Sequence, residues 1–565
     1  MITDKLTPVG YGRFLLLIAG FGGLLYGIDL GIIAAALLYL SKTINLSVAQ
    51  TSVIVAAVLA GGMLSCLIAG ILADWLGRKK MMVLSGLMFI ASIGLIVLSQ
   101  NFTLLLAGRL LQGMSGGVIA VVIPLYLAES LPPASRGKGT AIFQLMLTFG
   151  IVVAAIAGWF YTQQAETAIA AAAGNSTLIR AAQDHAWRSM FLATLYPGLI
   201  FFAGTFFLVE SPRWLFRKGR TADALASLLR LGSRQEAELQ LHEMQTLASE
   251  KKSKPSQHTT DSLLQRKYVV PFCLACLVLA CTQATGINSV NSYSVLILKQ
   301  AGMTPTHATQ SDVFVKLLHC VMTMLALPLV DCRGRTFLLK IGTGGIICSL
   351  LAGAFLFHSF ESKRVNVREA VQQAQSGNTL TLPVSSSMFD QKSTASPKTL
   401  TVLYSYGDGD KVATALSSDP QSVLRIAPPA KNLYSPLLIK RAFYEPVAQQ
   451  TTGWLITACL ALFVSFYSFG PGVVVWLALS ELMPTRIRST GMGIALLLNQ
   501  GVSTLIAALF LPVVGSFGYY AMFLFWAACT VVYFITAAFF LPETKGKTLE
   551  EIEELFDRNP YQKPA

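Results

Sequence analysis

The chain has 565 residues, of which 53% are hydrophobic and only 13% are charged, and its mean hydropathy is +0.58. Soluble domains carry about 25% charged residues, so this composition excludes an ordinary water-soluble protein. The net charge of +14 would suit nucleic acid, but the basic residues cluster in a few loops between apolar runs, so no nucleic-acid partner is expected.

Twelve apolar runs are long enough to cross a bilayer, which takes about 20 residues per helix. The first run is too long for a cleavable signal peptide and is followed at once by others, so it is expected to stay in the membrane. The runs cover 13–40, 51–73, 81–98, 104–128, 139–161, 188–209, 269–298, 313–330, 337–357, 452–479, 490–514 and 518–541. The sequence therefore predicts an all-α membrane protein with twelve transmembrane helices.

Basic residues gather in alternate loops. One side holds Arg78, Lys79, Lys80, Arg136, Lys138, Arg333, Arg335, Arg486 and Arg488. The opposite loops hold little more than Lys42 and Lys299. By the positive-inside rule, both termini and the 213–267 linker are expected in the cytoplasm.

The nine cysteines lie mostly inside the predicted spans, so neither disulfides nor a metal site is expected. Cys273 and Cys276 have a metal-like spacing, but no second pair lies outside the bilayer, and helix packing explains them better.

The loop motifs occur twice. Asp74 to Arg78 and Asp331 to Arg335 both read D-x-x-G-R, after the second and eighth runs. Glu129 with Arg136, and Glu481 with Arg488, follow the fourth and tenth runs at one common spacing. Asp74 and Glu129 are 55 positions apart, whereas their counterparts Asp331 and Glu481 are 150 positions apart. The difference places an insertion in the second repeat, at about 358–450.

Two repeated six-helix bundles explain these spacings. The expected units are an N-terminal bundle (1–212), linker helices (213–267), a C-terminal bundle (268–545) interrupted by an extracytoplasmic insertion (358–450), and a cytoplasmic tail (546–565). The insertion contains a helix-like stretch at 365–375 and a strand-like stretch at 399–406, which is consistent with a small folded domain.

Repeated bundles of this kind imply rocking around a solute site near the bilayer midplane. The charged motifs would then act as a gate, pairing in one state and separating in the other. The alternative is that they only fix topology. The gating candidates in these motifs are Asp74, Arg78, Glu129, Arg136, Asp331, Arg335, Glu481 and Arg488.

At these and further motifs the sequence resembles the sugar porter family of the major facilitator superfamily, over nearly all of the chain except the insertion and the linker. The matches are Gly70 to Lys79, Gly108-Arg109, Pro124-x-Tyr126-x-x-Glu129, Arg136-Gly137, Glu210-Ser211-Pro212-Arg213-Trp214, Gln283 with Gly286-Ile287-Asn288, Gly470-Pro471-Gly472, Trp476 and Pro542-Glu543-Thr544-Lys545-Gly546. The resemblance implies transport of a sugar without ATP hydrolysis, cofactor or enzymatic activity. It also adds Glu210 and Arg213 to the gating candidates.

Asp29 lies inside the first span, where an unpaired carboxylate is costly and is a functional candidate by default. Arg109, in the fourth span, is the other buried charge of this half. In proton-coupled members of the family an acid and an arginine at these positions work together, so the resemblance implies a proton symporter. The alternative is a permanent structural ion pair.

Sugar recognition needs amide groups, which donate and accept toward hydroxyls, and aromatic faces. Gln283, Asn288, Tyr293, Trp476 and Asn499 match family sugar-site positions. The polar residues could instead bond between helices, and Trp476 could simply pack.

Several family positions are changed, which puts glucose itself in doubt. Ile151 and Thr282 replace glutamines, His319 replaces an asparagine, Gln500 replaces an aromatic residue, and Val473-Val474-Val475 replaces Pro-x-Pro. Lys316 shares a helix face with His319 and would suit a sugar acid, unless it snorkels to the interface.

The sequence therefore predicts a monomeric, proton-coupled sugar symporter in a bacterial cytoplasmic (inner) membrane. The alternatives are a facilitator, a sugar-acid or polyol porter, and a nutrient receptor that binds without transporting.

Overall fold

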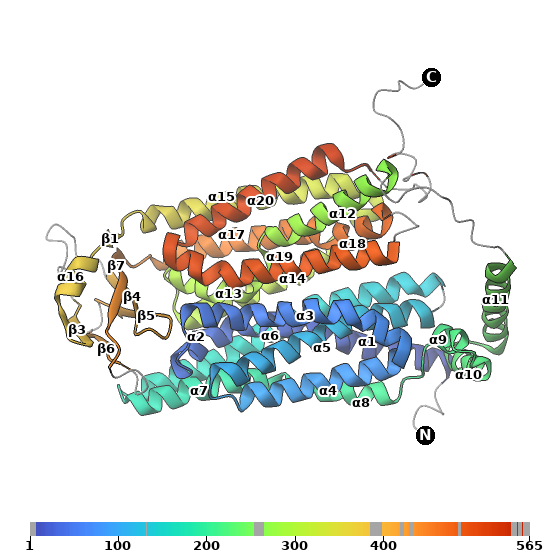
Figure 1. Cartoon of the computed structure of the whole chain (residues 1–565), viewed down its shortest axis with the longest axis horizontal. Helices are drawn as coiled ribbons and strands as arrows, with labels where there is room; N and C mark the ends of the chain where they lie inside the picture. Colours follow the sequence, from blue (N-terminus) through green and yellow to red (C-terminus); the bar gives the residue numbers. More distant parts are fainter. Residues whose placement is uncertain are drawn as a thin grey trace, which may run out of the picture.

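The computed structural model describes residues 7–131, 133–253, 265–384, 398–417, 423–428, 434–483 and 488–543, together with residues 551 and 556. Its long helices form two layers that lie side by side, one from the first half of the chain and one from the second (Figure 1). A β-rich insertion lies at one end of the layers, which we call the insertion end. Helices α9–α11 lie at the other, which we call the linker end.

The first layer, the N half, contains six helical segments, two of which are divided. Its helices are α1 (Pro8–Gly31), α2 (Ile33–Thr43), α3 (Val48–Leu76), α4 (Arg78–Val97), α5 (Phe102–Ser130), α6 (Pro133–Ala171), α7 (Ser176–Ala193) and α8 (Leu195–Phe206). The linker helices α9 (Pro212–Arg217), α10 (Thr221–Leu231) and α11 (Arg234–Ser253) follow.

The second layer, the C half, repeats this plan. It contains α12 (Arg266–Ala284), α13 (Ile287–Gln300), α14 (Pro305–Arg333), α15 (Arg335–Glu361), α17 (Gln450–Phe469), α18 (Pro471–Leu482), α19 (Arg488–Phe517) and α20 (Tyr519–Ile535), which continues into a π turn at Thr536–Phe540.

Eleven helical segments of the described part of the chain are long and apolar enough to span a membrane. The counterpart of the predicted eighth span, α14, is not among them. Its 29 residues cover the predicted run 313–330, within which the side chains of residues 327 and 330–332 lie outside the described part of the chain. Asp312, Lys316 and His319 of this helix are buried.

Close backbone approach holds the helices of the N half together. A Cβ atom at Gly27 of α1 would lie 1.9 Å from the carbonyl oxygen of Leu147 in α6, and one at Gly113 of α5 would lie 2.0 Å from that of Val58 in α3. Small residues are the usual means of such contact in membranes, where no hydrophobic force between helices is available.

The insertion folds around its own apolar core. Its elements are β1 (Val365–Asn366), α16 (Arg368–Gln373), β2 (Gln375–Ser376), β3 (Thr379–Pro383), β4 (Lys398–Ser405), β5 (Asp410–Leu416), β6 (Val423–Ile426) and β7 (Leu438–Pro446). They form antiparallel sheets in the orders β1-β7-β4-β5 and β2-β3-β6. Leu400, Val402 and Ala442 alternate onto the buried face, as the period of a strand requires. Strand β4 covers the stretch that the sequence indicated.

The insertion contacts both halves. At its base, Arg364 donates to Glu361, at 3.1 Å, and to Glu445, which ties β7 to the end of α15. The turn before β5 lies against the start of α3, since a Cβ atom at Gly409 would be 2.9 Å from that of Ser47. A domain fixed to one half therefore touches the other at the insertion end.

Glu361 also caps α20, and this contact gives a testable prediction. Its carboxylate accepts from the backbone N–H groups of Tyr519, at 3.0 Å, and Tyr520, at 3.1 Å. Gly518 before them has φ +92°, and a Cβ there would lie 2.6 Å from the Glu361 carboxylate. We expect Gly518→Ala to lower stability by about 1–3 kcal/mol, measured as thermal unfolding in detergent. Gly515→Ala is the control, because nothing lies within 4 Å of its Cβ position; equal melting of the two variants would contradict the prediction.

Candidate functional site

A cavity of about 120 Å³ lies between the two halves, and both contribute to its walls. The N half supplies Tyr26, Leu30, Gln144, Leu147, Thr148 and Ile151, from α1 and α6. The C half supplies Gln283, Ile287, Asn288, Asn291, His319, Thr323, Tyr467, Gly472, Asn499 and Gln500, from α12–α14 and α17–α19. The wall from the C half is the more polar one.

Amide side chains on one wall are linked by hydrogen bonds. Gln283 donates to the side-chain oxygen of Asn499 at 3.2 Å and accepts from Asn288 at 3.0 Å. Asn288 also donates to the hydroxyl of Ser503 at 2.8 Å, and Asn499 donates to the Leu279 carbonyl at 3.0 Å. These bonds hold the amides in a fixed orientation beside the cavity, as preorganised recognition requires.

A break in the helix brings Gln283 and Asn288 together. Helix α12 ends at Ala284 and α13 begins at Ile287, while Gly286 between them has φ +88°. A Cβ at Gly286 would lie 2.4 Å from the Trp526 ring, so only glycine fits this turn. Broken helices at the midplane are a common way to build a solute site in transporters.

One predicted sugar-site residue, Tyr293, is not on the cavity wall. The Tyr293 ring stacks on Phe510 with centroids 4.2 Å apart, and its hydroxyl donates to the Ala507 carbonyl at 3.0 Å. Tyr293 thus joins α13 to α19 and does not line the cavity. The side chain of Trp476 lies outside the described residues. Gln283, Asn288, His319, Asn499 and Gln500 do line the cavity.

Three of the altered family positions, Ile151, His319 and Gln500, also line the cavity. Ile151 and His319 both line it, and the His319 ring lies 6.5 Å from that of Tyr467 in an edge-to-face arrangement. Within the described part of the chain, His319 Nδ1 has no hydrogen-bond partner. An imidazole nitrogen on the cavity wall is available to a solute, as a donor or an acceptor according to its tautomer.

The sequence reasoning missed Tyr26, Gln144, Asn291 and Tyr467, which also line the cavity. A signal was present for Gln144, which lies one helical turn before Thr148 in an otherwise apolar run. Polar residues spaced by four share one helix face, so this pair indicated an inward-facing stripe on α6.

Asp29 and Arg109 lie buried in the N half, each 1% exposed. In the described structure neither oxygen of Asp29 has a hydrogen-bond partner, while Oδ2 lies against Gly116 of α5. Arg109 donates instead to the side-chain oxygen of Gln112 at 2.5 Å, and its guanidinium lies 5.5 Å from the centre of the Phe191 ring. The two residues share a region of the bundle without a direct hydrogen bond.

Arg78 is the centre of a charged cluster at the linker end. Its Nε lies 2.8 Å from Glu129 Oε2, and its Nη2 lies 2.8 Å from Asp74 Oδ1. Arg217 of α9 also contacts Glu129, at 2.9 Å, and Ser211 donates to Glu129 at 2.5 Å. Glu129, at the end of α5, is therefore bound by Arg78, at the start of α4. The side chain of Arg136 lies outside the described residues.

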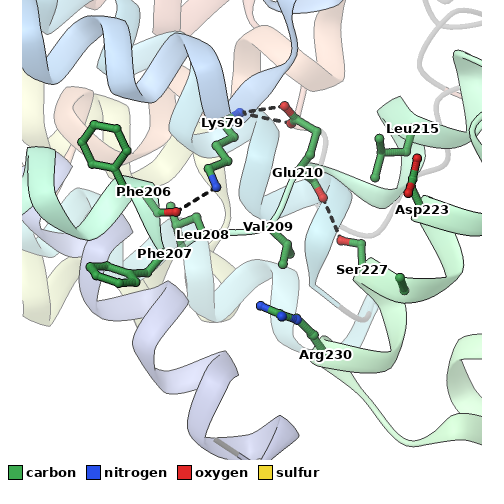
Figure 2. Close-up of a pocket in the computed structure, with 11 residues that line it drawn as sticks. Lys79, Phe206, Phe207, Leu208, Val209, Glu210, Leu215, Asp223, Ser227 and Arg230 are labelled. Carbon is green, nitrogen blue, oxygen red and sulfur yellow. Dashed lines mark hydrogen bonds between the residues drawn. The ribbon is translucent and has the colours of Figure 1, made fainter. Parts of the chain in front are cut away.

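Glu210 caps the start of α4, as Figure 2 shows. Its carboxylate accepts from the backbone N–H groups of Arg78 at 2.8 Å and Lys79 at 3.1 Å, where the positive end of the helix dipole favours an anion. Lys79 Nζ donates to the Phe206 carbonyl, and Ser227 donates to that of Glu210. These contacts line a linker-end cavity of about 350 Å³, which does not reach the central one. Arg213 of α9 is exposed.

The C half repeats this cap. Glu543 accepts from the backbone N–H groups of Arg335 and Thr336, each at 3.0 Å, at the start of α15. Gly334 before them has φ +91°, as Gly77 before α4 has φ +102°. Glu210 and Glu543 each follow the last span of their half. The side chains of Asp331, Glu481 and Arg488 lie outside the described residues.

Comparison with known proteins gives consistent results. A family model described as "Sugar (and other) transporter" matches residues 15–371 and 438–556. The chain is 28% identical to the glucose transporter GlcP of Staphylococcus epidermidis, over 97% of this chain and 98% of that protein. It is 25% identical to the arabinose-proton symporter of Bacillus subtilis, over 95% and 93%. The inward-open structure of the xylose transporter XylE from E. coli superposes with a TM-score of 0.67, at 19% identity, over 96% of this chain and 98% of that one. This last similarity shows the fold, that of the major facilitator superfamily.

Proposed function

Because the chain belongs to the sugar (and other) transporter family, we propose that it takes up a sugar by proton symport, through alternating access of a central cavity. The observation that carries the proposal is the hydrogen-bonded set of Gln283, Asn288 and Asn499 on the wall of a cavity shared by both halves.

The chemistry of the wall suits a polyhydroxylated ring. An amide offers two donors and an acceptor, so it can bond to adjacent hydroxyls whatever their hydrogen positions. Tyr26 and Tyr467 supply aromatic surface for the apolar side of a ring. The apolar Ile151, from the N half, and the imidazole of His319, from the C half, change the pattern of the family site. The preferred solute is then a sugar other than glucose, or a polyol.

Sugar acids are less well supported. Lys316 is not on the cavity wall, and its ammonium lies 2.7 Å from Asp312 Oδ2. The expected snorkelling is wrong, because the Lys316 side chain is only 2% exposed and ends in this ion pair. A lysine whose charge is already neutralised offers little to the carboxylate of a solute.

Asp29 is the proposed proton carrier. A carboxyl group buried in the membrane without a bonded partner is free to exchange a proton if the cavity admits water, and it lies one turn from Tyr26 on the cavity wall. The Arg109 guanidinium, held in place by its hydrogen bond to Gln112, would set the electrostatic potential around Asp29. A facilitator would need no such carboxyl group, which makes coupling testable at this position.

The charged motifs at the linker end are the proposed gate. The Arg78 cluster and the Glu210 and Glu543 caps hold each half rigid, so the halves move as units while contacts between them change. We place the linker end in the cytoplasm and the insertion end outside a bacterial inner membrane, because the basic loops lie at the linker end. A monomer is sufficient, since one chain contributes both halves of the site.

Counterflow of labelled sugar in proteoliposomes tests transport. A transporter exchanges internal for external solute without a gradient, whereas a nutrient receptor on the same fold binds without translocation. The solute itself is found by a thermal-shift screen of sugars and polyols, because a ligand that binds only the folded state raises the melting temperature.

Gln283→Ala is expected to weaken sugar binding by about tenfold or more, because it removes an amide and the acceptor that orients Asn288. The measurement is the ligand-induced thermal shift over a range of sugar concentrations. Gln164→Ala is the matched control, since Gln164 is exposed on α6. If both variants bind as tightly as the parent chain, the site does not include Gln283.

A further inference from the structure

A second pair of charges is buried in the C half, away from the cavity wall. Asp312 and Lys316 of α14 lie one turn apart, with Lys316 Nζ 2.7 Å from Asp312 Oδ2 and both side chains 2% exposed. Ser294 of α13 donates to the other carboxylate oxygen at 2.5 Å. Ionisable residues inside a membrane protein are costly and are usually kept for a function.

The ammonium of Lys316 also crosses to the other half. It lies 3.5 Å from the carbonyl oxygen of Gly31, the last residue of α1. The helix is interrupted there, since α1 ends at Gly31 and α2 begins at Ile33. The carbonyl end of a helix carries the negative end of its dipole, so a cation is attracted to this position. Asp312 holds the ammonium in place for this contact.

The clamped segment also carries Asp29, two residues before Gly31. Other polar contacts also join the two halves, either close to the Lys316–Gly31 contact or closer to the insertion end. The Leu511 N–H of α19 donates to Ser52 of α3 at 3.3 Å, and the Thr148 hydroxyl lies 3.6 Å from Cys320 Sγ. Among these contacts, only that of Lys316 brings a full charge across the interface.

We propose that Lys316 is a positioning residue for alternating access: its ammonium, oriented by Asp312, clamps the end of α1 to α14 and keeps the insertion end closed. The proposal rests on the alternating-access function proposed above. Opening at the insertion end must separate Lys316 from Gly31, so the contact biases the equilibrium between the two states. Because α1 also carries Asp29, the clamp links the proposed proton carrier to the movement of the halves.

The competing explanation is that Lys316 only neutralises Asp312. The two explanations differ in a double variant. Asp312→Asn with Lys316→Met removes both charges and leaves no unpaired ion, so a purely neutralising lysine would be dispensable in it. A clamp would still be lost, because the contact with the Gly31 carbonyl needs the ammonium.

The test is a distance measurement between spin labels at Gln100 in the N half and Lys363 in the C half, on the full chain with its reactive cysteines replaced. Both labelled residues are exposed at the insertion end. We expect Lys316→Met and the double variant to shift the population toward the longer distance by on the order of tenfold. Lys316→Arg should keep the parent distance, because it keeps the charge, and Lys340→Met, on the exposed surface of α15, is the control.

A parent-like distance in either Lys316→Met or the double variant would overturn the clamp. The measurement needs neither sugar nor a proton gradient. A failure here would therefore leave the transport proposal intact, and a failure of counterflow would leave a measured shift in distance intact.

Discussion

Asp29→Asn should abolish sugar accumulation driven by a pH gradient while leaving counterflow of labelled sugar in place. The asparagine keeps the shape of the carboxyl group and cannot carry a proton. The cavity and its amide wall are untouched, so binding and exchange continue. The expected accumulation ratio falls to that of passive equilibration.

The measurement uses proteoliposomes with an imposed pH gradient, and counterflow on the same preparation. Asp408→Asn is the matched control, because Asp408 lies in the insertion and pairs with Lys411 far from α1. If gradient-driven accumulation persists in Asp29→Asn, Asp29 is not the coupling group. If the parent chain itself shows exchange without accumulation, the protein is a facilitator.

The geometry around Asp29 bears on how coupling would work. The resemblance led us to expect an ion pair between Asp29 and Arg109. Protonation of Asp29 would then break this pair. In this structure Arg109 bonds to Gln112 instead, and the Asp29 carboxyl group has no bonded partner in the described chain. Asp29 and Arg109 therefore make no direct hydrogen bond in this conformation, although they lie close enough to interact electrostatically.

The fold could be predicted because it depends on patterns that are local in the sequence. Apolar runs of bilayer length, repeated loop motifs and alternating basic loops are visible residue by residue. They locate most helices to within a few residues, and the strand signal at 399–406 locates β4 (Lys398–Ser405). The exceptions are α6, which ends at Ala171 rather than 161, α7, which begins at Ser176 rather than 188, and α14, which begins at Pro305 rather than 313. The insertion's sheet order was beyond reach, because β1 pairs with β7 across 70 or more residues, and pairings of that length leave no local trace.

The candidate site was predictable where polar residues interrupt apolar helices. Gln283, Asn288 and Asn499 match sugar-site positions of the family that the sequence resembles, and all three line the cavity. The alternative role, bonding between helices, is present as well, since Gln283 of α12 donates to Asn499 of α19. Tyr293 was misplaced, since an aromatic residue suits packing and ring recognition equally, and only the stacked Phe510 decides between them. Asp312 was missed because it lies at the edge of the apolar run 313–330, where a charge is normally assigned to the interface.

The charged motifs show the same limit. The sequence led us to expect an acid at one helix end to meet an arginine from a neighbouring span, without saying which residues meet. Arg78 reaches Glu129 because the N-terminus of α4 lies beside the end of α5. Such contacts depend on how the helix ends meet in space.

Arg78→Ala should destabilise the protein by about 3–5 kcal/mol, the usual cost of removing one member of a buried ion pair. The Arg78 side chain is 1% exposed, bonds to the Ala73 carbonyl at 2.8 Å and contacts both Asp74 and Glu129, so the alanine leaves a cavity and under-compensated carboxylates. Arg217→Ala is the matched control: Arg217 contacts the same Glu129, but its side chain is 53% exposed, so a loss of only about 0–1 kcal/mol is expected. Both are measured by unfolding in detergent. Equal stability of the two variants would mean that burial does not set the strength of this cluster, and would contradict the proposal that the Arg78 network keeps the N half rigid.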